Sequence, residues 1–409
     1  MMKKEIEDIN LEEVPKKYIL LQNEYTLSYT PEDCFVNDNA IESKSEGKLT
    51  GKDLCFEKQK SFYNSFLKRH FKNVVVLSAA GTSLDNGPEE KSGKSRLGLW
   101  DFCKKEIEAI SELIEGFKEK PFYKNKDIEG LLSFIILYEK LNGELKNGED
   151  NLKQPLESKI VEACNLQLQS QAPHKDFLNK IIARKPSDPR VQLFTTNYDL
   201  LFETAANESG FIVIDGFSFT QPRRFSGRYF DLDIVNREKT RIKQEESFIS
   251  KVIHLYKLHG SLNWFKDNAE RIIQQDNPTK PLIIYPANEK YESSFEQPYF
   301  EMMSRFQQSL RKENTLLIVI GFGFQDKHIQ NVIIEAVEQN PSFQLLIVNY
   351  GNTGGIDTTY LKSFFVDKVN MKAKRNVSIV FDTFSGFTKN YPSNSTYIEP
   401  HKDIADGSL

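Results

Sequence analysis

The chain has 409 residues, of which 39% are hydrophobic and 27% are charged, and its formal net charge is −4. This length and apolar content are enough to bury a large core, so the composition excludes an intrinsically disordered protein. The small net charge indicates neither direct binding to nucleic acid nor a polybasic membrane surface. In addition, no apolar run reaches the roughly 18–20 residues that a membrane-spanning helix needs.

The cysteines Cys34, Cys55, Cys103 and Cys164 are widely separated in the sequence. Their spacing provides neither a Cys-x-x-Cys half-site for zinc nor a compact disulfide framework. We therefore expect reduced thiols and no bound metal. The N-terminus begins Met-Met-Lys-Lys-Glu and is too polar for a signal peptide, so a cytoplasmic protein is expected.

Residues 1–54 are polar and irregular apart from one apolar segment, Tyr18 to Leu21. We interpret them as an N-terminal arm or partner-binding extension. The spacing of apolar residues from Leu54 to His70 predicts an amphipathic helix. Residues 55–390 are expected to form the main domain, and residues 391–409 a polar tail.

Short apolar runs, typical of strands buried on both faces of a parallel sheet, recur along the main domain. Between several of them lie helical patterns, at Ile107–Phe117 and Ile329–Val337. This alternation predicts an α/β fold with a Rossmann-like, doubly wound and mainly parallel sheet. The predicted strands are Val74–Leu77, Val191–Thr195, Phe211–Ile214, Leu255–Leu258, Leu282–Tyr285, Leu316–Ile320, Leu345–Val348 and Val377–Phe381.

The stretch at about 97–189 breaks this alternation and predicts a helical insertion between the first two core strands. It includes helices at Ile128–Leu141, stopped by Gly143, and at Ser158–Leu168. The charged segment Arg237–Ser247 is expected to be a smaller excursion from the core.

The first core strand continues into Ser78-Ala-Ala-Gly-Thr-Ser-Leu-Asp85. Small residues after a buried strand let the backbone approach a ligand, and a following helix N-terminus can face a pyrophosphate. Any strand-to-helix turn also favours small residues, and Ser and Thr are common N-caps, so both interpretations stay open. The nearby segment Gly87 to Ser95 resembles a P-loop, but five residues separate its glycines where four are required, and we interpret it as a solvated, flexible loop.

Two further strands end in polar residues. Thr196, Asn197 and Asp199 follow the second core strand. Asn197 can both donate and accept hydrogen bonds to a ligand, although it and Asp199 could instead cap the helix that begins near Leu200. His259 and Gly260 follow another strand. Histidine suits proton transfer near neutral pH, yet a histidine at a strand end is more often a structural hydrogen-bonding residue.

A fourth turn, Gly321-Phe-Gly-Phe-Gln-Asp326, joins a buried strand to an amphipathic helix. Gly321 and Gly323 permit close approach of the backbone to a dinucleotide, with Phe324 beside them. Asp326 either caps the helix, which we favour, or contacts ribose hydroxyls. Asn349, at the end of a later strand, is a weaker candidate for the adenosine side. Because carboxyl ends of parallel strands share one edge, these turns are expected to form a single crevice.

In this order the motifs resemble the sirtuin-like NAD-binding domains of bacterial anti-phage defence proteins, over about Val74 to Asn349. Ala79 to Ser83 is similar to the family's Gly-Ala-Gly-x-Ser, with Ala in place of the first Gly. Thr196 to Asp199 is similar to its Gln-Asn-x-Asp element, and Leu258 to Ser261 to its catalytic His-Gly. The turn at Gly321–Asp326 is similar to the family's late glycine-containing turn.

The resemblance implies an NAD glycohydrolase that cleaves NAD to nicotinamide and ADP-ribose. It implies that Asn197 orients the nicotinamide ribose and the water, that His259 is the general base, and that Asp85 supports the developing positive charge. It also implies a role as effector of anti-phage defence by NAD depletion, as a homo-oligomer beside a HerA-type hexameric ATPase. The remaining NAD-binding residues that it implies are Ala80, Gly81, Thr82, Ser83, Thr196, Asp199, Gly260, Gly321, Gly323, Phe324 and Asp326.

Two departures from the wider sirtuin pattern bear on the reaction. The structural zinc module is missing, and Leu84-Asp85-Asn86-Gly87 replaces the usual Gly-Ile-Pro-Asp-Phe-Arg loop. Both argue against a protein deacylase. The alternatives are a sensor that holds NAD or ADP-ribose without turnover, and a scaffold that keeps the fold for assembly only.

Overall fold

The computed structural model describes residues 16–41, 50–107, 116–147, 150–185, 187–236, 248–283, 297–350, 363–367 and 369–394. Three predicted features therefore lie largely or wholly outside the described residues. They are most of the helical pattern at Ile107–Phe117, the excursion at Arg237–Ser247, and the tail from residue 395 onward.

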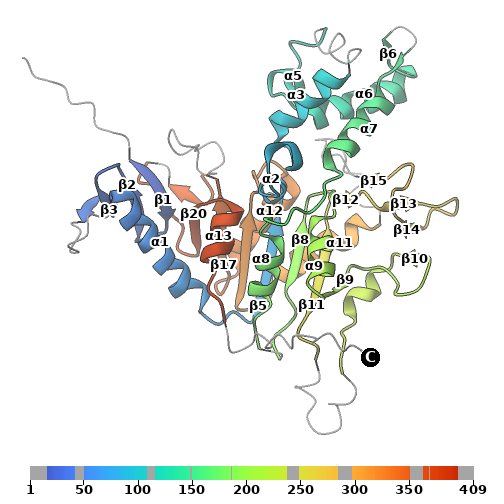
Figure 1. The fold of residues 1–409 in the computed structure, drawn as a ribbon. Coiled ribbons are helices and arrows are strands. Elements are labelled where there is room, and N and C mark those ends of the chain that lie inside the picture. Colours follow the sequence, from blue (N-terminus) through green and yellow to red (C-terminus); the bar gives the residue numbers. More distant parts are fainter. Residues whose placement is uncertain are drawn as a thin grey trace, which may run out of the picture.

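A central sheet of eleven strands organises the molecule (Figure 1). Seven of the strands pair in parallel, in the order β20-β17-β16-β5-β8-β11-β9. This confirms the predicted α/β fold with a mainly parallel sheet. The seven strands are β5 (Asn73–Ser78), β8 (Gln192–Thr195), β9 (Ile212–Ile214), β11 (Val252–Lys257), β16 (Thr315–Ile320), β17 (Gln344–Asn349) and β20 (Val377–Phe381).

Helices cover both faces of this sheet, because alternate residues of the buried strands point to opposite sides. In β5, Val75 and Leu77 belong to one hydrophobic cluster, whereas Val74 and Val76 belong to another. The first cluster includes residues of α11 (Tyr299–Leu310) and α12 (Lys327–Gln339). The second includes residues of α1 (Gly51–Leu67), α8 (His174–Ile181), α9 (Leu201–Glu208) and α13 (Phe384–Asn390).

The N-terminal segment adds an antiparallel meander to the sheet, which the polar sequence did not predict. Its strands are β1 (Lys17–Leu21), β2 (Thr26–Tyr29), β3 (Cys34–Val36) and β4 (Asn39–Ile41), and β1 pairs antiparallel with β20. The strands were missed because each is only three to five residues long and none shows the alternation of buried and exposed positions that would reveal a strand in the sequence. The proposed role of residues 1–54 in binding a partner stays a prediction.

The helical insertion rises above the sheet as a separate lobe (Figure 1). Its helices α3 (Arg96–Glu106), α5 (Pro121–Lys124), α6 (Ile128–Asn142) and α7 (Lys153–Cys164) share a core of their own, which includes Trp100, Leu131 and Leu156. By contrast, Phe177 of α8 belongs to a core cluster of the central sheet. The short pair β6 (Lys146–Asn147) and β7 (Asp150–Asn151) joins α6 to α7.

The predicted core strand at Leu282–Tyr285 is wrong. Leu282–Ile283 forms β15, which pairs antiparallel with β12 (Gly260–Ser261) outside the central sheet, and residues 284 and 285 lie outside the described ones. The run is apolar for another reason, since Ile283 packs against the core of the insertion. Further small elements are β10 (Arg223–Arg224), β13 (Trp264–Lys266), β14 (Ile272–Gln274), β18 (Val366–Asp367), β19 (Lys372–Ala373) and the 3₁₀ helix η2 (Gly227–Asp231).

Most residues of the segment that resembles a P-loop are exposed, as predicted for a solvated loop, but parts of it are fixed by hydrogen bonds. It contains the 3₁₀ helix η1 (Glu89–Lys91), and the Gly93 N–H donates to Ser83 O at 2.8 Å. Ser92 and Asn86 are buried, and Asn86 Nδ2 donates to the carbonyls of Lys91 and Gln167. Gly87 to Ser95 therefore serves as a connection into the insertion.

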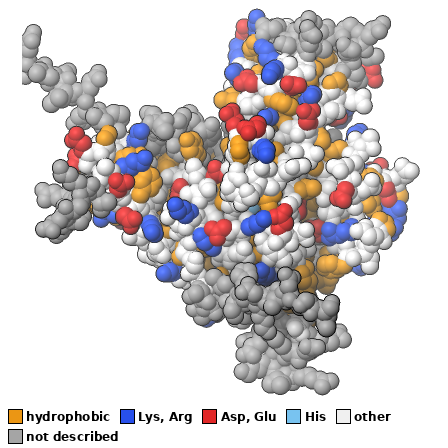
Figure 2. All heavy atoms as spheres, in the orientation of Figure 1, with side chains coloured by type: hydrophobic (Ala, Val, Ile, Leu, Met, Phe, Trp, Pro, Cys, Tyr) orange, Lys and Arg blue, Asp and Glu red, His pale blue; other side chains and the backbone are white. Residues whose placement is uncertain are grey.

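Among the described residues, no helix is long and apolar enough to cross a membrane. On the face seen in Figure 2, acidic and basic side chains are intermixed, in keeping with the small net charge of the chain.

Candidate functional site

The turns that carry the candidate residues all begin at one row of the central sheet. In this row Ile320, Ser78, Thr195 and Lys257 are register partners across β16, β5, β8 and β11. Asn197 and His259 each lie two residues beyond this row, after the ends of the neighbouring strands β8 and β11. The structure thus places the two sequence-predicted catalytic residues at the same edge of the sheet, where doubly wound folds bind their ligands.

Two of the turns are in backbone contact. Gly81, in α2 (Ala80–Leu84), donates its N–H to Gly321 O at 3.2 Å, and Gly321 has a φ of +65°. A Cβ atom on either glycine would lie 2.4 Å from the Cα of the other, which is closer than real structures allow. These glycines are therefore needed for packing of the turns, whether or not a ligand also approaches them.

Asn197 is bound to the turn that follows β5. Its Nδ2 donates to Ala79 O at 3.1 Å, to Thr82 Oγ1 at 3.2 Å and to Ser83 Oγ at 2.8 Å. No acceptor role of its Oδ1 is found among the described residues. Because the amide nitrogen is held in place by three acceptors, Oδ1 has a fixed direction in which it can accept a hydrogen bond from a ligand.

Asp199 lies just before Leu200, the N-cap residue of α9, and extends this network. Its Oδ1 accepts from the Leu201 N–H at 3.1 Å at the start of α9, while its Oδ2 accepts from Ser83 Oγ. Asp199 and Ser83 are both buried. Asp199 thus orients the Ser83 hydroxyl, and Ser83 in turn accepts from the Asn197 amide.

His259 and Asp326 form a hydrogen-bonded pair that the sequence did not predict. His259 Nε2 lies 3.0 Å from Asp326 Oδ2, and the two side chains are 12% and 14% exposed. Asp326 Oδ1 meanwhile accepts from the N–H groups of His328 and Ile329, so the aspartate is also the N-cap of α12. Burial by itself raises the pKa of Asp326, but the hydrogen bond and charge of His259 and these two N–H groups outweigh it and hold the pKa below its usual value.

The contacts of most of the remaining predicted residues serve the packing and hydrogen bonding of the fold itself. Gly260 has a φ of +87° and faces Leu282 O so closely that a side chain would collide with it. Phe324 is buried against Phe322 and Phe365, and Thr196 continues the ladder through its N–H to Ser78 O. Ala80 is exposed at the start of α2. Gly323 lies in the turn after β16, and Asn349, at the end of β17, accepts from the Asp382 N–H through its backbone carbonyl at 3.0 Å.

Asp85 does not join the Asn197 and His259 groups through any hydrogen bond found among the described residues. Its Oδ2 accepts from the Ser385 N–H at 2.7 Å, in the first turn of α13. The carboxylate is thus engaged with the N-terminus of a helix, an arrangement that satisfies a backbone donor. Its predicted role in supporting developing positive charge stays a prediction.

Sequence reasoning missed two ionisable groups beside these turns, one buried and one half-buried. Lys257, at the end of β11, is paired with Glu203 of α9 at 2.8 Å and its side chain is 2% exposed. Asp382, directly after β20, accepts from Tyr63 Oη and from the Thr383 N–H. A signal for both was present, because a charged residue inside or directly after an otherwise apolar strand is unusual.

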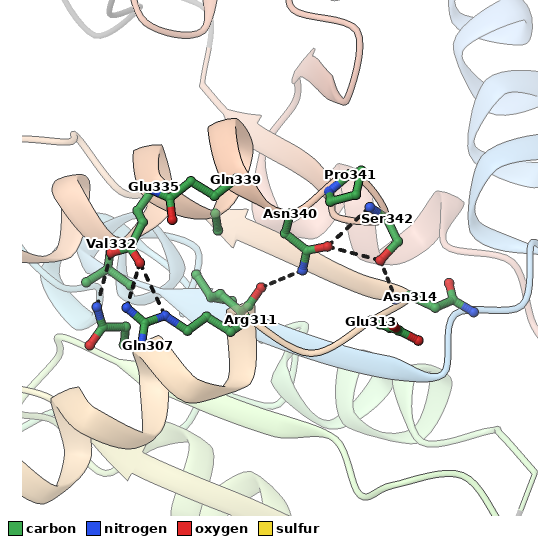
Figure 3. A pocket seen from close by; sticks show the side chains of 12 residues that line it. Gln307, Arg311, Glu313, Asn314, Val332, Glu335, Gln339, Asn340, Pro341 and Ser342 are labelled. Carbon is green, nitrogen blue, oxygen red and sulfur yellow. Dashed lines mark hydrogen bonds and ion pairs between the residues drawn. The ribbon is translucent and has the colours of Figure 1, made fainter.

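A cavity of about 620 Å³ lies elsewhere, between α11, α12 and the turn before β17 (Figure 3). Gln307 of α11 and Arg311, directly after this helix, reach across it to Glu335 of α12. Its lining includes none of the candidate residues, and it lies at the opposite ends of the strands from them. Within the described part of the chain, no group of three or more His, Cys, Asp or Glu side chains could hold a metal ion.

Comparisons with known proteins found one family model and similar solved structures. No curated protein matches the chain. One solved structure, titled as a study of the mechanism and regulation of Sir2 enzymes, matches at 12% identity and a TM-score of 0.36, over 81% of this chain and 94% of that one. Another, on sirtuin substrate affinity, matches at 13% identity and a TM-score of 0.34, over 82% and 97%. Residues 191–363, which carry Asn197, His259 and Asp326, match the model of the SIR2-like domain.

Proposed function

We propose that this protein is an NAD glycohydrolase, which cleaves the bond between nicotinamide and ribose and releases nicotinamide and ADP-ribose. The observation that carries the proposal is the placement of Asn197 and His259. Both lie two residues past one register row, after adjacent parallel strands. Asn197 is held by a carbonyl and two hydroxyl oxygens, and His259 is held by the Asp326 carboxylate. The match of residues 191–363 to the SIR2-like domain supports NAD as the substrate.

In this proposal Asn197 positions the reacting groups. Its Nδ2 is fixed by Ala79, Thr82 and Ser83, so that Oδ1 is the atom that would accept from a ribose hydroxyl or from the attacking water. Such positioning lowers the barrier because the entropy of orienting the reactants is lost before the reaction begins. The backbone of the Gly81 turn would receive the pyrophosphate.

His259 would act as the general base, with Asp326 as the group that orients it. A carboxylate only accepts hydrogen bonds, so in the neutral imidazole the proton shared with Asp326 resides on Nε2, and Nδ1 is the nitrogen that can take up a proton. Once His259 is protonated, the nearby negative charge of Asp326 stabilises it. General-base catalysis of this kind typically contributes about 10²- to 10⁴-fold to the rate.

The test is nicotinamide release from NAD by the purified protein and by the variants Asn197→Ala and His259→Ala. The chain offers matched controls. Asn340 also donates to two backbone carbonyls, and His70 is also paired with an aspartate, Asp188, yet both lie outside the site. We expect a loss of at least about 100-fold for the two site variants and less than about threefold for Asn340→Ala and His70→Ala. NAD binding by calorimetry without release would instead favour a nucleotide sensor.

The resemblance to defence-associated sirtuin domains further supports a cellular role for this reaction. We propose that the protein depletes NAD during phage infection, as an oligomer that acts with a HerA-type hexameric ATPase. The test compares NAD levels and phage yield in cells that co-express the ATPase with the wild-type protein or with His259→Ala. Equal phage yield in both strains would remove this role without affecting the enzymatic proposal.

A further inference from the structure

Lys257 is a buried cation at the boundary between the two catalytic turns. It is the last residue of β11, it precedes His259 by two positions, and its side chain is 2% exposed. Removing an ammonium group from water is costly unless it is paired and hydrogen-bonded. The partners of this buried ammonium group therefore indicate which segments of the structure it stabilises.

The partners of Lys257 all come from the connection between β8 and α9. Its Nζ donates to the backbone carbonyls of Tyr198 and Asp199 and to Glu203 Oε1. The two carbonyls belong to the residues that directly follow Asn197. The side chain at the end of β11, the strand that precedes His259, is thus hydrogen-bonded to the backbone of the turn that carries Asn197.

We propose that Lys257 is a positioning residue that sets the Asn197 turn relative to His259. This inference rests on the proposed function of the two residues. Lys257 does not contact a ligand itself, because its ammonium group is enclosed by Tyr198, Asp199 and Glu203. It acts through the backbone to which it donates.

Two further contacts explain why a shift of this backbone reaches the amide of Asn197. The Leu262 N–H, beyond His259, donates to the same Tyr198 carbonyl at 3.1 Å. On the other side, the Asp199 carboxylate accepts from Ser83 Oγ, which in turn accepts from Asn197 Nδ2. If Lys257 no longer holds the Asp199 backbone, the Asp199 carboxylate that aligns the Ser83 hydroxyl moves. Ser83 Oγ is one of the three acceptors that fix the Asn197 amide, so this amide loses its fixed position.

The contribution of the carbonyl contacts can be separated from that of the ion pair. Lys257→Met keeps the length of the side chain but removes all three donated hydrogen bonds. Glu203→Gln removes the charge of the partner and leaves the contacts with the Tyr198 and Asp199 carbonyls. A suitable control is Arg223→Met, which breaks the ion pair of Arg223 with the buried Asp215 after β9, outside the Asn197 turn.

The experiment measures nicotinamide release and amide hydrogen exchange of residues 196–203 for all four proteins. We expect Lys257→Met to lower kcat at least tenfold, with the KM for NAD changed less than threefold, and to speed exchange in this segment at least tenfold. Glu203→Gln should retain kcat within about threefold even if its thermal stability falls, and Arg223→Met should change neither kcat nor the exchange of residues 196–203.

The proposal is overturned if folded Lys257→Met keeps the wild-type kcat and exchange pattern, or if Glu203→Gln loses as much kcat as Lys257→Met. If Lys257→Met does not fold, Glu203→Gln is compared with the wild-type protein: a kcat within threefold and unchanged exchange of residues 196–203 support the proposal, and a larger loss of kcat overturns it. If the wild-type protein releases no nicotinamide, the proposed function fails. In that case hydrogen exchange alone tests whether Lys257 holds the Asn197 turn.

Discussion

Asp382 provides a quantitative test of the electrostatics beside the candidate site. It directly follows β20, and its carboxylate accepts from Tyr63 Oη at 2.9 Å and from the Thr383 N–H at 2.9 Å. Burial raises the pKa of Asp382 to about 6, with a further contribution from the nearby Asp85, against the opposing effect of the two hydrogen bonds. We predict that Asp382→Asn stabilises the protein at neutral pH.

The pKa of Asp382 in the unfolded chain is about 3.9, so folding raises it by about two units. Between these two values the folded protein holds a proton that the unfolded chain releases. The stabilising contribution of the neutral carboxyl is therefore complete below about pH 4 and is lost as the pH rises through about 6. At 1.36 kcal/mol per unit, the ionised carboxylate costs up to about 3 kcal/mol above pH 6.

An amide at position 382 stays neutral and can still accept from the Thr383 N–H. We expect Asp382→Asn to raise the free energy of unfolding by about 1–3 kcal/mol at pH 7.5 and to change it little at pH 4.5. Urea denaturation followed by tryptophan fluorescence at several pH values measures this difference. Asp85→Asn should give a smaller gain, because it removes only one source of the shift. A gain for Asp382→Asn that does not depend on pH, or a loss at pH 7.5, would refute this reasoning.

Three further predictions concern single residues. Asp326→Asn should leave the melting temperature nearly unchanged, since Asn is an equally good N-cap, but should lower nicotinamide release about 10- to 100-fold by removing the negative charge beside His259; a wild-type rate would contradict the assigned role. Gly321→Ala should destabilise the protein in urea denaturation by about 2–4 kcal/mol, and Gly143→Ala, at a similar φ but with no atom nearby, by only about 1–2 kcal/mol; equal losses would remove the packing explanation. An uncharged thiol reagent at pH 8, followed by mass spectrometry, should label Cys164 before Cys103, because burial raises the pKa of Cys103 to about 12; the reverse order would contradict this burial.

The parallel core of the fold could be predicted from the sequence because its strands are buried on both faces. Such strands appear as continuous runs of Val, Ile and Leu, as in Thr315–Ile320 and Gln344–Asn349, and a run of this kind needs no partner to be recognised. The meander at residues 17–41 had no comparable signal. Its strands are short, and only their pairing with each other and with β20 makes them part of the sheet.

The order of the candidate turns could also be predicted, but their contacts could not. That Asn197 and His259 reach one edge of the sheet follows from their positions after two parallel strands. That Asp326 pairs with His259 depends on the turn between β16 and α12, in which Phe324 has a φ of +53°. The contact of Asp85 could not be predicted either, because the N–H that donates to its carboxylate belongs to Ser385 of α13, more than 290 residues later in the chain.

Asp326 also explains why the structural and the functional interpretation of a motif need not exclude one another. Its Oδ1 caps α12, and its Oδ2 binds His259, so each oxygen serves one purpose. The cap fixes the aspartate at the helix N-terminus, and that position brings the second oxygen to the histidine. A loss of activity in Asp326→Ala alone would therefore not identify which oxygen matters. Comparison with Asp326→Asn does, because the amide retains the cap through Oδ1 and replaces the negatively charged acceptor that faces His259 with an uncharged donor.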